Sequence, residues 1–161
     1  MSKHLFNTEK INYIKGDKPE VDCILCSIRD RSKEVQCLEV HRTDRFIISM
    51  NKYPFNPGHL MVFPHRHITD LRDLTDDEAL EMHKLLSRSI TILKKELAPS
   101  GFNVGFNIGN GSGASIEHVH QQIIPRYGNE INFIDVLNGT RVVVVDPVKI
   151  MDRLKEGFRD F

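Results

Sequence analysis

The chain has 161 residues, a length that suits one domain built around one hydrophobic core. Its 22 lysines and arginines balance 22 aspartates and glutamates, which excludes a global field that would attract nucleic acid or an anionic membrane. The longest apolar runs, such as residues 142–145, fall far short of the roughly 20 residues of a membrane span. We therefore expect neither nucleic acid nor a membrane among its partners.

The amino-terminal residues lack the long apolar stretch and the cleavage site of a signal peptide. We therefore expect a cytoplasmic protein without disulfides, in which the isolated Cys37 lies in the core. No repeat, low-complexity stretch or proline-rich linker divides the chain, so residues 1–161 are expected to form a single domain.

Apolar and β-branched runs predict strands over residues 34–41, 44–50 and 59–64, the first two forming a hairpin. Two prolines and a glycine in residues 51–58 predict a loop before the third strand. Two further strands are expected over residues 103–108 and 118–124, on either side of a glycine-rich turn.

Two helices are predicted as well. Thr75 and Glu78 match a capping box, so the first helix begins there and ends near residues 98–101. Its expected core stripe has helical spacing and consists of Ala79, Met82, Leu86, Ile90, Leu93 and Leu97. A short helix should begin at Asp146-Pro147, with its buried side formed by Val148, Met151 and Leu154 or Phe158. The chain is therefore predicted to be α+β: an antiparallel sheet of about five strands with one long and one short helix.

The segment around His118-Val119-His120-Gln121-Gln122 is the most informative. On a strand, the two-residue period puts His118, His120 and Gln122 on one face. A solvated strand face and a two-histidine metal site are the plain alternatives. The preceding glycine-rich turn favours phosphate chemistry, because its backbone amides can form an anion nest and neutral imidazole is a competent nucleophile.

Several segments together resemble the histidine triad superfamily: Pro57-Gly58-His59 with Phe63-Pro64, Gly105-Phe106-Asn107 before the glycine-rich turn, and His118 to Arg126. The resemblance spans residues 22–126, leaves residues 127–161 as a carboxy-terminal extension, and implies a HIT-like fold. It also implies that His120 is the nucleophile and that the backbone carbonyl of His118 orients its ring.

The chain departs from the triad at Gln122, where the hydrolase branches have a third histidine. The pattern H-x-H-x-Q resembles two transferase groups, galactose-1-phosphate uridylyltransferase and the diadenosine tetraphosphate phosphorylases. Glutamine can hold a phosphoryl oxygen but cannot supply a proton at neutral pH, so a covalent intermediate can persist until a second anion arrives. The uridylyltransferases have a much longer, duplicated chain, which ranks them low.

The resemblance further implies the substrate-binding residues. Asn51 and His59 should line the nucleotide side of the pocket, while Asn107, Gly113 and Ser115 should lie at the phosphates or the leaving group. We expect adenylyl transfer through a nucleotidyl-histidine, with a diadenosine polyphosphate or related adenylyl anhydride as substrate and inorganic phosphate as acceptor. A hydrolase of dinucleoside polyphosphates or phosphoramidates is the alternative, and a zinc-stabilised nucleotide-binding module is a third.

Cys23 and Cys26 form a C-x-x-C pair, which by spacing alone indicates either a metal site or a buried or redox pair. The resemblance implies that His67 and His118 complete a four-ligand structural Zn²⁺ site, with His65 as the competitor of His67. It also implies a homodimer. Whether Mg²⁺ accompanies the nucleotide stays open.

Overall fold

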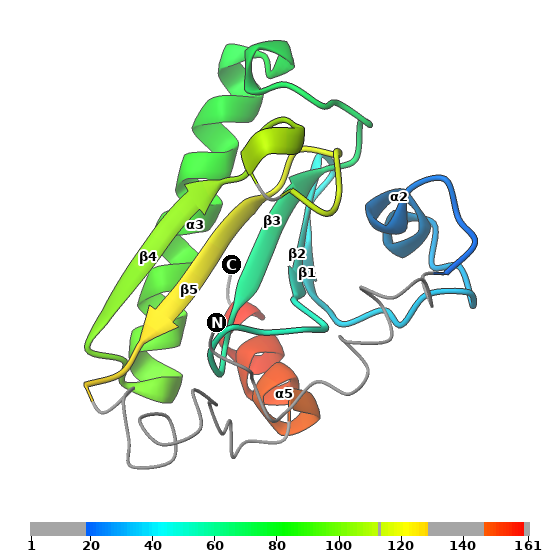
Figure 1. Ribbon diagram of the computed structural model, residues 1–161. Coiled ribbons are helices and arrows are strands. Elements are labelled where there is room, and N and C mark those ends of the chain that lie inside the picture. Colours follow the sequence, from blue (N-terminus) through cyan, green and yellow to red (C-terminus); the bar gives the residue numbers. More distant parts are fainter. Residues whose placement is uncertain (1–18, 113, 129–146, 160–161) are drawn as a thin grey trace.

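A computed structural model describes residues 19–112, 114–128 and 147–159. Its centre is an antiparallel sheet in the order β1-β2-β3-β5-β4 (Figure 1). The strands are β1 (Glu39–Arg42), β2 (Phe46–Met50), β3 (Leu60–Pro64), β4 (Gly101–Phe106) and β5 (Gln121–Arg126). The described helices are α2 (Ile24–Arg29), α3 (Asp76–Leu97) and α5 (Pro147–Phe158), with 3-10 turns η1 (Leu71–Asp73) and η2 (Asn110–Ser112). The predicted α+β class with a five-stranded antiparallel sheet is confirmed. In the part of the chain described, no helix combines the length and apolarity that crossing a membrane requires.

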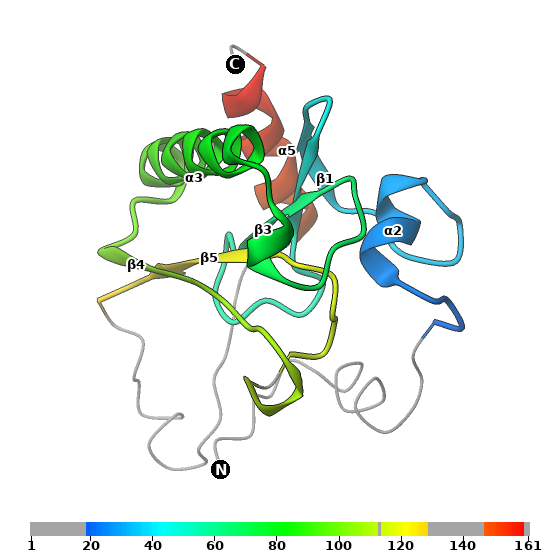
Figure 2. The ribbon, with the colours of Figure 1, turned by 90° about the horizontal axis from the view of Figure 1, so that it is seen from above.

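Both faces of the central strands are covered, since every residue of β2 and β3 is buried. Alternate side chains such as Ile48 and Val62 pack beneath α3 and α5, which lie together on one face of the sheet (Figure 2). The intervening side chains, among them Ile47, Met61 and Phe63, pack against α2 on the other face. This two-residue alternation explains why strands 46–50 and 60–64 read as continuous apolar runs.

Helix α3 begins with the predicted capping box, in which the Thr75 hydroxyl accepts from the Glu78 amide and the Glu78 carboxylate accepts from the Thr75 amide. The core stripe is rotated from the predicted one. Met82 and Leu93 are buried as expected, but Leu85 is buried more deeply than Leu86, and Ala79 is exposed. The stripe turns because Leu85 and its neighbours on the same side face the sheet.

Glu78 also stabilises the start of α3 through an ion pair with Arg66. The substitution Glu78→Gln tests this contribution. The Arg66 guanidinium, 2.6 Å from the carboxylate, holds the pKa of Glu78 at about 2, against an ordinary value of 4.5. Because the folded-state pKa is the lower one, this stabilisation is complete above pH 4.5 and is lost as the pH falls toward 2. We expect Glu78→Gln to lower the free energy of unfolding by about 1 to 2 kcal/mol at pH 7, since one partner is half exposed.

Urea unfolding at pH 7, 5 and 3.5 measures this difference, which should shrink at the lowest pH. Asp152→Asn, which removes an exposed carboxylate on α5, is the control and should change little. A Glu78→Gln effect of the same size at all three pH values would contradict the ion-pair account.

Helix α5 begins at Pro147 as predicted, while Asp146 lies outside the described residues. Its buried side was predicted wrongly at Val148, which is 47% exposed. Leu154 and Phe158 are buried as predicted, and Met151 is half-buried and packs against the core. The buried side includes Ile150 in place of Val148.

Other local predictions were displaced or missed. The first strand begins at Glu39 rather than residue 34, and the last begins at Gln121 rather than His118. Cys37 is exposed rather than in the core, because it precedes the strand in an irregular segment. Helix α2 was not predicted, since it has only six residues and too few turns to show a helical period.

Candidate active site and metal centre

His120 is held in an orientation suited to nucleophilic attack. Its ring Nδ1 lies 2.8 Å from the backbone oxygen of His118, so Nδ1 carries the proton and donates it to that carbonyl. The other ring nitrogen, Nε2, then keeps its lone pair. Burial lowers the pKa of His120 below its ordinary value, which favours the neutral imidazole.

His120 lies in the wall of a cavity of about 690 Å³. Gln122, one alternate residue further along, lines the same cavity. Most of the remaining wall is apolar. Its apolar residues include Ile24, Leu25, Ile28, Val35, Met50, Met61 and Ile116. The cavity therefore combines a large apolar surface, suited to a flat organic group, with a polar end that contains His120.

Three of the predicted substrate-binding residues, Asn51, Asn107 and Ser115, line this cavity. Gly113 lies outside the described residues. In the described part of the glycine-rich turn, the Ser112 amide and hydroxyl both donate to the Gly109 carbonyl. Residues 114–116, which follow the turn, line the cavity, whereas residues 109–112 are not among its lining residues.

His59, the other residue predicted for the nucleotide side of the pocket, is not among the residues that line the cavity. It is fully buried, its Nδ1 accepts from the Phe55 amide at 3.2 Å, and its ring stacks on Phe55. Its backbone oxygen also accepts from the amide of Asn51 at 2.9 Å. His59 therefore braces the loop that presents Asn51 and Phe55 to the cavity.

Gly58, which directly precedes His59, shapes the same end of this loop. Its φ is +78°, in the left-handed region, and a Cβ there would lie 2.5 Å from the side chain of Leu97. Only glycine combines that backbone angle with such a close approach to α3. The Pro-Gly-His segment is thus explained by packing and loop shape.

The expectation that His118, His120 and Gln122 share one face is corrected by the structure. Only Gln122 belongs to β5, where it pairs with Gly105 on one side and Met61 on the other. The two histidines precede the strand, and the backbone at His118 is bent. His120 and Gln122 consequently line the cavity, whereas the His118 ring turns away toward the cysteine pair.

Sequence reasoning also missed that α2 forms a wall of the cavity. Ile24 and Ile28 are separated by one helical turn and both line it, and the fully buried Leu25 lies between them. The i, i+4 spacing of the two isoleucines was the only available signal, and six residues are too few to make that signal specific.

Cys23, Cys26, His67 and His118 bring one ligand atom each to a common point, all within 4.8 Å of one another. Cys26 Sγ lies 3.3 Å from His67 Nδ1, and His118 Nδ1 lies 3.5 Å from Cys23 Sγ and 3.6 Å from Cys26 Sγ. Two sulfurs and two imidazole nitrogens are a donor set that can bind a metal tetrahedrally. The predicted grouping is present, and His65 is not part of it.

The second coordination layer suits a metal ligand. His118 Nε2 donates to the Pro64 oxygen at 3.0 Å, which leaves the lone pair of Nδ1 facing the sulfurs. Burial and the neighbouring His67 lower the pKa of His118 to about 4, so its ring stays neutral. Burial raises the pKa of Cys26 to about 11, so a metal ion that binds here must displace a thiol proton.

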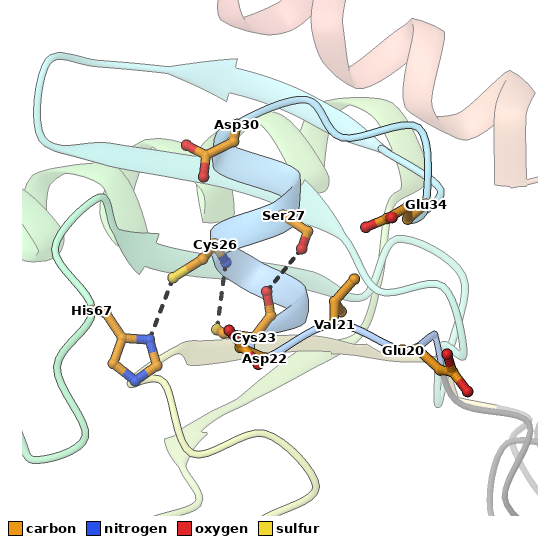
Figure 3. A pocket seen from close by; sticks show the side chains of 9 residues that line it. All are labelled: Glu20, Val21, Asp22, Cys23, Cys26, Ser27, Asp30, Glu34 and His67. Atoms are coloured by element: carbon orange, nitrogen blue, oxygen red, sulfur yellow. Dashed lines mark hydrogen bonds between the residues drawn. The ribbon is translucent and has the colours of Figure 1, made fainter.

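A second hollow, of about 640 Å³, lies on the outer side of this centre (Figure 3). In Figure 3 the His67 ring points toward the Cys26 sulfur, and Cys23 lies at the start of the helix beside it. The hollow is also lined by four acidic residues, Glu20, Asp22, Asp30 and Glu34, and by Val21 and Ser27. Cys23, Cys26 and His67 therefore line a hollow that is distinct from the cavity of His120, although Glu34 lines both.

Comparison with known proteins agrees with this geometry. A family model described as HIT domain matches residues 32–129, more than half of the chain. The chain belongs to the HIT domain family. It is 44% identical over 95 residues to an AP-4-A phosphorylase of Mycobacterium tuberculosis, a match that covers 58% of this chain and 49% of that protein.

A second relative is the asymmetrical bis(5'-nucleosyl)-tetraphosphatase of Schizosaccharomyces pombe, 33% identical over 86 residues, with 53% of this chain and 47% of that protein covered. The chain thus spans about half the length of each of these two relatives. A crystal structure of a Zn-bound histidine triad family protein from Mycobacterium smegmatis superposes with a TM-score of 0.70 at 22% identity, covering 84% of this chain and 92% of that one. That likeness shows a shared HIT fold.

Proposed function

We propose that this HIT protein is a nucleotidyl transferase that splits diadenosine polyphosphates, diadenosine tetraphosphate above all, by phosphorolysis. The observation that carries the proposal is the 2.8 Å contact between His120 Nδ1 and the His118 carbonyl at the polar end of the cavity. The 44% identity to an AP-4-A phosphorylase supports this choice of substrate. The apolar wall suits an adenine ring, and the volume of the cavity accommodates one nucleotide unit.

The proposed reaction has two displacements at the same phosphorus. Nε2 of His120 attacks the α-phosphorus, the N–P bond forms, and the bond to the bridging oxygen breaks to release ATP. The Nδ1–H bond to the His118 carbonyl stabilises the positive charge that the ring acquires. An oxygen of inorganic phosphate then attacks the same phosphorus, the N–P bond breaks, and ADP leaves with His120 neutral again.

Gln122 has the second role in this scheme. It lies beside His120 in the cavity and is half-buried. Its amide can hold a phosphoryl oxygen through both displacements, yet it cannot protonate a leaving group or activate water at neutral pH. The adenylyl-His120 would therefore be long-lived enough to meet phosphate. Asn107 and Ser115 are proposed to contact the phosphates, and Asn51 the nucleoside.

We also propose that the four-residue centre binds a structural Zn²⁺. The donor set of two thiolates and two imidazoles is typical of zinc, and four protein ligands leave no position for a reacting water. The zinc-bound state of the Mycobacterium smegmatis neighbour supports the assignment. The homodimer remains a proposal that sedimentation would test.

Incubation with diadenosine tetraphosphate, with and without labelled inorganic phosphate, tests the proposed reaction. We expect ADP and ATP only when phosphate is present, with the label in the ADP, because phosphate becomes its β-phosphoryl group. Separation of the nucleotides by chromatography measures the products. AMP and ATP formed at the same rate without phosphate would instead assign the chain to hydrolysis.

Hydrolysis is the second candidate because of one observation, the similarity to the asymmetrical tetraphosphatase of Schizosaccharomyces pombe. In that reaction water replaces phosphate in the second displacement, and the products are AMP and ATP. The presence of Gln122 rather than histidine in the cavity favours phosphorolysis.

A further inference from the structure

The metal centre and the nucleotide cavity share a structural element, helix α2. Cys23 is the N-cap of this helix and Cys26 lies in its first turn. The residues between and after them, Ile24, Leu25 and Ile28, line the cavity of His120. Two faces of one six-residue helix thus serve the two sites.

The attachment of α2 is uneven along its length. At its carboxyl end, Arg29 donates to the His65 oxygen at 2.8 Å, and Arg42 donates to the Arg29 oxygen at 3.1 Å. At its first turn, the hydrogen bonds to other described segments all run through the two sulfurs, toward His67 and His118. Thiols make only weak hydrogen bonds, and a helix of six residues is not stable by itself. The first turn is therefore held by the apolar packing of the buried Leu25 and by polar contacts that all pass through the cluster.

The cluster is also connected to His120, through His118. His118 contributes its ring to the cluster and its backbone oxygen to His120 Nδ1 at 2.8 Å. A bond between the cysteines and His118 through a common ion would therefore fix the apolar wall relative to the attacking nitrogen.

We propose that metal binding at Cys23, Cys26, His67 and His118 sets the affinity of the cavity for the nucleotide, because it holds the α2 wall against the segment that carries His120. The cysteines are positioning residues in this account and touch no substrate. The inference rests on the proposed function for the identity of its ligand, an adenine nucleotide, and goes beyond it in making nucleotide binding depend on the metal.

The first test uses the full chain, stripped of metal with a chelator under reducing conditions and reloaded with one equivalent of Zn²⁺. AMP is titrated into both forms by calorimetry, and amide hydrogen exchange of residues 24–29 is followed without nucleotide. We expect Zn²⁺ to tighten AMP binding at least tenfold and to slow exchange in α2. Equal AMP affinity in the two forms would overturn the inference.

Variants separate positioning from folding. Cys26→Ser should weaken AMP binding, whereas Cys26→His, which restores a nitrogen ligand, should recover it once Zn²⁺ is bound. Cys37→Ser, at an exposed cysteine outside both sites, is the matched control and should behave as the parent chain. A Cys26→His protein that binds one Zn²⁺ but binds AMP as weakly as Cys26→Ser would contradict the proposal that the metal positions α2.

Ile24→Ala tests the wall without touching a metal ligand. It should keep one bound Zn²⁺ and lose AMP affinity several-fold, and unchanged affinity would overturn the role of α2. If the Zn²⁺-loaded parent bound no AMP at all, the proposed function would fail. The positioning of α2 by the metal would then be tested by hydrogen exchange alone. Amide exchange in α2 that did not slow on addition of Zn²⁺ would overturn it.

Discussion

His120→Ala is expected to lower kcat for diadenosine tetraphosphate cleavage by about 10⁴-fold or more, because it removes the atom that forms the covalent intermediate. AMP binding should stay within a few-fold of the parent, since the apolar wall of the cavity is intact in this variant. Nucleotide chromatography measures kcat, and acid-labile label on the protein after incubation with labelled substrate measures the intermediate. The parent chain should carry the label and the variant should not.

His83→Ala is the matched control for this prediction, because His83 is exposed on α3 outside the cavity and the metal centre. Its rate should equal that of the parent. A His120→Ala protein that retained more than a tenth of the parent rate would exclude nucleophilic catalysis by this residue. The nucleotide-binding module would then be the better description of the chain.

The sequence was most informative where side chains of unusual type occur at fixed spacing. The capping box at Thr75 and Glu78 was predicted from spacing, and the grouping of Cys23 and Cys26 with two distant histidines from the family resemblance; both are present. In each case the chemistry demands particular residues, a hydroxyl opposite a carboxylate or four N/S donors, and few other arrangements satisfy it.

The sequence was least informative where tertiary packing determines the position of a residue. His59 is polar, yet it is fully buried and braces the loop, since its Nδ1 accepts a hydrogen bond from the Phe55 amide. Helix α2 is invisible to periodicity because it is short, and its position depends on side chains that are distant in sequence. The bend at His118 likewise depends on side chains that are distant in sequence. The ring contacts the cysteine pair, and the strand begins only after it.

Those two outcomes explain why one side of the cavity was predicted and the other was not. Asn107, Ser115 and His120 line the cavity, and the resemblance to the histidine triad superfamily had placed them in the pocket. The apolar wall is assembled from α2, residues before β1 and the two central strands, whose side chains resemble any buried set. Apolar composition predicts that residues are buried but does not say which of them face a ligand.

Gln122→His is expected to convert phosphorolysis into hydrolysis. The new imidazole would lie beside His120 at the polar end of the cavity, where Gln122 now lies. Unlike an amide, it can accept a proton from water attacking the adenylyl-His120 and return it afterwards. Because general base catalysis contributes about 10² to 10⁴-fold, we expect AMP release without phosphate to rise by at least about 10²-fold over the parent chain. Chromatography of AMP, ADP and ATP with and without phosphate measures the partition.

Gln122→Met separates proton transfer from simple loss of the amide. Methionine has a similar length and no strong hydrogen-bonding group, so this variant should form the intermediate more slowly and should not release more AMP than the parent. A rise in AMP with both substitutions would mean that Gln122 only excludes water from the intermediate. If neither substitution raised AMP release, the choice of acceptor would have to be made elsewhere in the cavity, and the residues after the glycine-rich turn, Ala114 and Ser115, would be the next to substitute.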